Sequence, residues 1–104
     1  MAISYFDVVP NPISQHRKAR PFYVCVQHTM LDHLRTRLMA PLLSANMKQH
    51  TRLHPVLDIA GQKVILDPTD LITMNLRHLG NPIANVASES FRIIGAIDLV
   101  LTGV

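Results

Sequence analysis

Histidine offers the widest choice of chemistry in this sequence, which holds six of them in 104 residues. His50 and His54 are four residues apart, the spacing at which two imidazoles on one helix can bind the same metal ion. Pro55 follows at once, and no glutamate stands between the pair as it does in the zinc-protease motif. Because a zinc site needs three or four converging ligands, we expect neither a metal site nor another cofactor.

Cys25 is the only cysteine, so no intrachain disulfide can form, as is usual in a reducing compartment. A thiol could act as a nucleophile, but Cys25 lies in FYVCVQ (22–27), whose residues alternate between the two faces of a predicted strand. A half-buried small hydrophobic residue is therefore the stronger interpretation. The sequence has no nucleophile elbow, phosphate-binding loop or dinucleotide fingerprint, and it does not indicate an enzyme.

Two further pairs of residues each have two interpretations. Arg35 and Arg37 could bind phosphate, or they could face solvent at the start of a strand. Met30 and Leu31 lie in the polar turn HTMLDH, where two large apolar side chains either plug the core or form a binding surface.

Charge is spread unevenly along the chain. Residues 1–52 carry seven Lys/Arg and two Asp, a net +5, whereas residues 53–104 carry three Lys/Arg and five Asp/Glu, a net −2. A basic half attracts nucleic acid or an acidic protein segment, although an ordinary solvated face is the alternative. Two Tyr and three Phe offer little for bases to stack on, so we favour an acidic protein partner and expect no sequence-specific nucleic-acid binding.

Six segments are predicted as strands from their β-branched and aromatic content and their two-residue periodicity. They are residues 3–9, 22–27, 37–42, 54–59, 63–66 and 72–76. The proline-rich stretch 10–21 is expected to be a long exposed hairpin loop, and AGQ (60–62) a turn. Asp67 and Asp70 flank a Pro–Thr pair and are expected to cap a short helical turn over 68–71.

Ser88–Leu101 is predicted to be a helix. Ser88 is the expected N-cap, and Gly103 follows the last turn as a C-terminal glycine commonly does. Apolar side chains cover nearly the whole circumference of this helix, and one face of a sheet cannot bury all of them. A partner that covers part of the helix is therefore expected.

The length is that of a single domain, which we expect to span residues 1–104. The opening MAISYFDVVP lacks the basic and apolar regions of a signal peptide, and no apolar run approaches the ~18 residues of a membrane span. We expect a soluble cytoplasmic protein that does not contact a membrane.

The stretches FYVCVQHTMLDHLRTRLMAPL, LHPVLDI, DPTDL and AIDLVLTGV, in this order, resemble the CcdB family, the toxins of type II toxin–antitoxin modules found on plasmids and chromosomes. The resemblance covers about four-fifths of the chain. It implies a mainly β fold, an SH3-like antiparallel barrel of the CcdB/Kid/MazF kind with a C-terminal α-helix. It also implies a homodimer that does no chemistry, binds the A subunit of DNA gyrase and stabilises the cleaved-DNA state of that enzyme.

The resemblance assigns six positions to gyrase binding. They are the tip of the helix, Thr102, Gly103 and Val104, together with Asp98, Met30 and Leu31. The best-known member of the family has Trp in place of Thr102 and Asn in place of Asp98. The resemblance further implies a CcdA-like antitoxin with a disordered acidic tail, and the basic residues expected to contact it are Arg17, Lys18 and Arg20.

Two alternatives share this architecture. A MazF/Kid-like ribonuclease would use groups such as His16, Arg17 or Arg20 for acid–base chemistry and phosphate stabilisation. A CcdB relic would still bind antitoxin without poisoning gyrase, which Thr102 in the place of an aromatic anchor allows.

Overall fold

A computed structural model describes residues 3–45 and 52–103 of the chain. The elements in chain order, with η for a 3₁₀ helix, are β1 (Asp7–Pro10), η1 (Ser14–His16), β2 (Phe22–Cys25), η2 (Thr29–Leu31), β3 (Thr36–Ser44), β4 (Val56–Ile59), β5 (Gln62–Leu66), β6 (Ile72–Asn75), η3 (Leu76–His78), β7 (Ala84–Asn85), η4 (Ala87–Glu89) and α1 (Ser90–Thr102). The described chain is mainly β.

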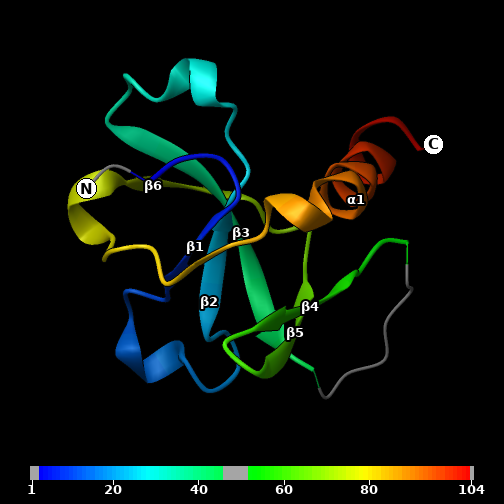
Figure 1. Ribbon diagram of the computed structural model, residues 1–104, viewed down its shortest axis with the longest axis horizontal. Coiled ribbons are helices and arrows are strands. Elements are labelled where there is room, and N and C mark those ends of the chain that lie inside the picture. The colour runs from blue at the N-terminus through cyan, green and yellow to red at the C-terminus, as the bar shows by residue number, and fades with distance from the viewer. Residues whose placement is uncertain (1–2, 46–51, 104) are drawn as a thin grey trace.

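The long strand β3 organises the sheet because both of its edges are paired. β2 pairs with one edge, and the other edge is shared between β6, opposite residues 36–39, and β5, opposite residues 42–44. β1 and β7 extend the sheet beyond β2, β4 extends it beyond β5, and every pairing is antiparallel. The sheet curls into a nearly closed barrel with α1 packed against it (Figure 1), which confirms the predicted SH3-like barrel with a C-terminal helix.

Both faces of the central strands are buried, and each faces its own apolar cluster. In β2, Phe22 and Val24 point toward the cluster under α1, which includes Ile93 and Ala96. Tyr23 and Cys25 point to the opposite cluster, which also contains Ile3, Val9 and Met39. The alternation predicted for residues 22–27 is therefore confirmed, and it explains why this run is apolar on both faces.

The strand predicted over residues 3–9 begins too early. Residues 4–7 form a turn in which the Ser4 N–H donates to the Asp7 carboxylate over 2.9 Å and the Asp7 N–H donates to the Ser4 carbonyl over 3.0 Å. Phe6 adopts a left-handed φ of 68°, which is costly for a residue with a side chain. Burial of its ring and a 2.8 Å hydrogen bond from its N–H to the Cys25 carbonyl hold it there.

The N-terminal end of the helix also differs from the prediction. The 3₁₀ turn η4 precedes α1, and Ser88 lies inside that turn instead of capping the helix. The Asn85 side chain accepts the Ala87 N–H over 2.9 Å and so fixes the start of the turn. At the other end Gly103 takes a left-handed φ of 77° and its N–H donates to the Leu99 carbonyl, as predicted for a terminal glycine.

The helical turn predicted over residues 68–71 is wrong, because this stretch is a non-helical turn. Asp67 closes it by accepting the Thr69 N–H over 3.0 Å and the Thr69 hydroxyl over 2.6 Å. Asp70 caps nothing and instead forms an ion pair with Arg20 at 2.9 Å.

Candidate functional site

The η2 turn presents Met30 and Leu31 to solvent, with exposed fractions of 80% and 44%. Their interpretation as core plugs is therefore wrong. The His28 imidazole caps the turn, because its Nδ1 accepts the Met30 N–H over 3.0 Å. The apolar side chains are thus held outward by a hydrogen-bonded turn.

The outer face of α1 is apolar and exposed, as the sequence predicted. Phe91 is 89% exposed and Leu101 70%, whereas Ile93 and Ala96 on the inner face are fully buried. The Thr102 hydroxyl donates to the Asp98 carbonyl over 2.7 Å, one turn earlier in the helix. The Thr102 side chain therefore uses its hydroxyl within the helix. Val104, the last residue assigned to the gyrase-binding tip, lies outside the described residues.

Tyr5 packs against the apolar cluster beneath α1 and lies near the residue that caps the η2 turn. Its ring stacks on Phe6 with centroids 3.8 Å apart and lies 5.8 Å from the His28 ring. Burial raises the pKa of the Tyr5 phenol, with smaller contributions from Cys25 and from the Asp98 carboxylate of α1. The η2 turn and α1, the helix that contains Asp98, both lie in the upper half of the molecule in Figure 1.

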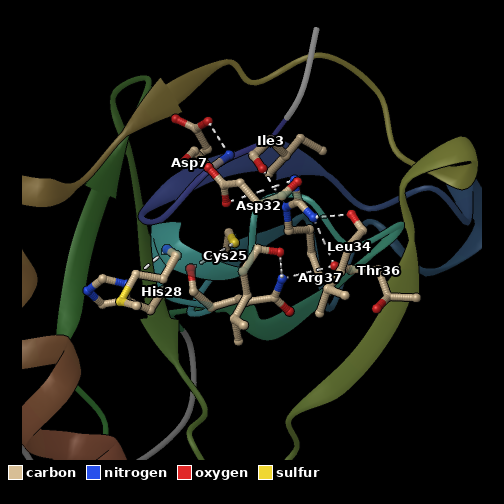
Figure 2. A network of polar contacts seen from close by, with 12 residues as sticks. Ile3, Asp7, Cys25, His28, Asp32, Leu34, Thr36 and Arg37 are labelled. Carbon is tan, nitrogen blue, oxygen red and sulfur yellow. Dashed lines mark hydrogen bonds and ion pairs between the residues drawn. The ribbon is translucent and has the colours of Figure 1, made fainter.

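Arg37, whose side chain is fully buried, holds the loop that follows the η2 turn. Its guanidinium donates to four backbone carbonyls, at distances of 2.6 to 2.9 Å (Figure 2). The acceptors are the carbonyls of Ile3, Asp32, Leu34 and Thr36. Arg37 therefore ties the N-terminal segment to the loop that follows η2, and both earlier interpretations, a phosphate ligand and a solvated side chain, are wrong for this residue.

Asp32 completes this network at the end of the turn. Its Oδ2 accepts the Ser4 hydroxyl over 2.7 Å, and its buried Oδ1 lies 3.9 Å from Arg37 Nη2 (Figure 2). The contact with Arg37 is longer than a hydrogen bond, so the carboxylate acts on the guanidinium through charge.

The basic loop between β1 and β2 is tied to the barrel by its arginines. Arg17 Nε donates to the Asn11 carbonyl over 2.6 Å, and Arg20 pairs with Asp70 and donates to the Tyr23 hydroxyl over 3.3 Å. Lys18 is exposed. These contacts leave Lys18 the freest cation of the three within the described loop.

Cys25 is fully buried, more than the half-burial predicted, and desolvation raises the pKa of its thiol. A buried, protonated thiol is a poor nucleophile. Among residues 3–45 and 52–103, no three His, Cys, Asp or Glu side chains lie close enough to hold a metal ion. His50, one half of the pair considered for a metal, lies outside these ranges.

Tyr5, His28 and Arg37 organise this side of the molecule, and the sequence alone did not point to them for that role. Tyr5 falls within the strand predicted over residues 3–9, and Arg37 is predicted to be a solvated or phosphate-binding residue. The contact between the Tyr5 and His28 rings and the hydrogen bond from Arg37 to the Ile3 carbonyl join segments far apart in the sequence, which local residue patterns do not encode.

No helix formed by the described residues is both long and apolar enough to cross a membrane.

Comparison with known proteins identifies the family of this chain. A comparison with curated proteins finds no match. The sequence does match the family described as CcdB protein, over residues 5–103. This match spans nearly the whole chain, including the turn at Met30 and the helix, and the chain therefore belongs to the CcdB family of toxin–antitoxin toxins.

Proposed function

We propose that this protein binds the A subunit of DNA gyrase through the end of α1 and the η2 turn, and that it stabilises the cleaved-DNA complex of that enzyme. Two exposed apolar sites carry the proposal: Met30–Leu31 on η2 and the outer face of α1 around Leu101. Exposed apolar groups of this kind mark surfaces that bind another protein.

This function needs no catalytic group. A protein that binds one conformation of an enzyme more tightly than the others shifts the population toward that conformation. The toxin would inhibit gyrase by binding most tightly to the state in which the DNA is cleaved. We therefore propose a toxin that is not itself an enzyme.

We further propose that a CcdA-like antitoxin neutralises this toxin and that Arg17, Lys18 and Arg20 contribute to its binding. Lys18 is the strongest candidate, since the two arginines already bind groups of the same chain. An acidic, disordered antitoxin tail would gain charge-assisted contacts with this loop as it becomes ordered.

The proposal is tested with purified gyrase in a supercoiling assay. We expect micromolar wild-type protein to block supercoiling and to yield linearised plasmid, and deletion of residues 102–104 to abolish both effects. Met30→Ser should weaken inhibition by about tenfold or more, because it removes an exposed apolar anchor. Ile83→Ser, which alters another exposed apolar side chain (48%), is the control and should inhibit like the wild type.

The alternatives give different results in the same experiment. RNA cleavage that survives deletion of 102–104 would support a MazF/Kid-like ribonuclease. The engagement of Arg17 and Arg20 within the fold already disfavours that role. Antitoxin binding without any effect on gyrase would support the relic and contradict gyrase poisoning.

A further inference from the structure

A concavity of about 490 Å³ opens between the loop after η2 and the segment from Asn75 to Arg77. The gyrase contact proposed above does not use it. Two arginines, Arg35 and Arg77, line this concavity together with His33 and two leucines, Leu34 and Leu76. We call it the Arg35–Arg77 pocket.

The pairing of β3 with β6 brings the two arginines together. Thr36 lies opposite Asn75 in the sheet, and the Leu76 N–H donates to the Arg35 carbonyl over 2.9 Å. The Asn75 side chain accepts the Arg77 N–H over 3.1 Å and so fixes the start of η3. Two segments far apart in the sequence thus place one guanidinium each at the same pocket.

The positive charge of the pocket is not neutralised from within. Neither Arg35 nor Arg77 forms an ion pair with any carboxylate of residues 3–45 and 52–103. Asp32 is the acidic residue of the lining, but its Oδ2 accepts the Ser4 hydroxyl and its Oδ1 is buried near Arg37. The Asp32 carboxylate is therefore turned toward the fold, and the two exposed arginines are available to an external anion.

The lining also selects the kind of anion. A guanidinium donates two parallel hydrogen bonds to a carboxylate or a phosphate. Leu34, 41% exposed, and Leu76 add apolar surface beside these donors, and the charged sugar–phosphate backbone of DNA carries no aliphatic side chain to pack on it. We propose that the Arg35–Arg77 pocket binds an acidic peptide segment that carries aliphatic side chains, its carboxylates on the arginines and its aliphatic groups on the leucines.

This inference rests on the proposed function for the source of the segment, which would be the acidic tail of the antitoxin. The pocket would then be a second contact, beyond the basic loop at Lys18. It lies next to the η2 turn, since the Leu34 N–H donates to the Leu31 carbonyl over 3.0 Å. A peptide seated there would crowd Met30 and Leu31 and so compete with gyrase.

The test measures binding of a synthetic peptide of glutamates interspersed with leucines, by calorimetry at low salt. Two competitors are measured beside it: the same peptide with Gln for Glu, and a short DNA duplex. We expect the acidic peptide to bind and Arg35→Gln and Arg77→Gln each to weaken it about tenfold, the effect of one charge-assisted hydrogen bond. Lys63→Gln and Arg52→Gln each remove one exposed positive charge elsewhere and should leave the affinity unchanged.

Three results would overturn the inference. They are equal binding of the Gln peptide, equal loss in the two control variants, and tighter binding of the duplex that depends on Arg35 and Arg77. Gyrase inhibition, measured on the same variants without peptide, separates this inference from the proposed function. If the Arg35→Gln and Arg77→Gln variants lose peptide binding but still inhibit gyrase, the result supports the pocket and leaves the proposed function standing. If the wild-type protein binds the peptide but does not affect gyrase, the result contradicts only gyrase poisoning.

Discussion

The buried guanidinium of Arg37 holds backbone segments in place through its hydrogen bonds to their carbonyls. Replacing Arg37 with Met would leave the carbonyls of Ile3, Asp32 and Leu34 without this donor, and Asp32 without the nearby cation. The Thr36 carbonyl would keep its second donor, Gln27 Nε2, at 3.0 Å. Each unpaired buried acceptor is costly, so we expect Arg37→Met to lower the free energy of unfolding by about 3–5 kcal/mol in urea titrations.

Arg35→Met is the matched control for that measurement, since Arg35 is only two residues away and exposed. Its effect on the free energy of unfolding should stay within about 0.5 kcal/mol. Similar losses for the two variants would mean that the buried guanidinium is not what secures the loop.

Cys25 links stability to pH. Desolvation raises the pKa of its thiol above the ordinary value of 9.0. The folded state therefore keeps this proton at pH values where the unfolded chain has lost it, and the Cys25 contribution to stability, complete below pH 9.0, declines as the pH rises above it. We expect the free energy of unfolding to fall less steeply above pH 9 in Cys25→Ala than in the wild type. Equal slopes would contradict this linkage.

The limits of sequence reasoning are clearest for single residues. Met30 and Leu31 stand out as apolar residues in a polar turn, and the structure exposes both. Arg35 and Arg37 look alike in sequence, yet one is exposed and the other is buried against carbonyls from Ile3 to Thr36. Three of the four acceptors lie within five positions of Arg37, but the fourth, the Ile3 carbonyl, is 34 positions away and is brought there by the tertiary fold.

Among the elements, α1 contains one glycine, Gly95, and is capped at its C-terminal end by another, Gly103, and the two have opposite requirements. Gly103 has a φ of 77°, which strains any other residue, whereas Gly95 lies within the helix, and a Cβ there would meet nothing within 4 Å. Gly95→Ala should raise the free energy of unfolding by up to about 1 kcal/mol, and Gly103→Ala should lower it by up to a similar amount. Thermal unfolding of the two variants checks both signs, and a loss of stability in Gly95→Ala would show that something contacts this face.

Element types were predicted better than element ends. β2 and the glycine at the end of α1 follow from strong local signals: the alternation of residues 22–27 and the conformational freedom of glycine. The start of β1 was wrong because Asp7 closes a turn through Ser4, and the start of α1 because Asn85 fixes a 3₁₀ turn first. In both cases a short polar side chain competes with regular backbone pairing.

At the scale of the whole molecule, the basic first half should govern binding of an acidic antitoxin. Residues 1–52 carry a net +5 and residues 53–104 a net −2. Salt screens exposed charges, so we expect the affinity for antitoxin to fall between low and high ionic strength. Isothermal titration at two salt concentrations checks this, and an unchanged affinity would contradict a contact led by charge.

The outer face of α1 bears on the homodimer that the resemblance to the CcdB family implies. Phe91 and Ile94 lie three residues apart on one stripe of the helix, and both are exposed in the single chain. In a two-fold dimer each of these side chains would be buried twice, once from each copy. Burying one phenylalanine contributes about 1.5–3 kcal/mol, so Phe91→Ser should raise the dimer dissociation constant about a hundredfold or more.

Sedimentation velocity over a dilution series measures that constant directly. The control is Ile83→Ser, which removes an exposed apolar side chain outside the helix and should leave the constant unchanged. If Phe91→Ser dimerises like the wild type, the stripe does not form the dimer contact. The exposed face of α1 would then be available to gyrase along its whole length, and Phe91→Ser should weaken gyrase inhibition instead.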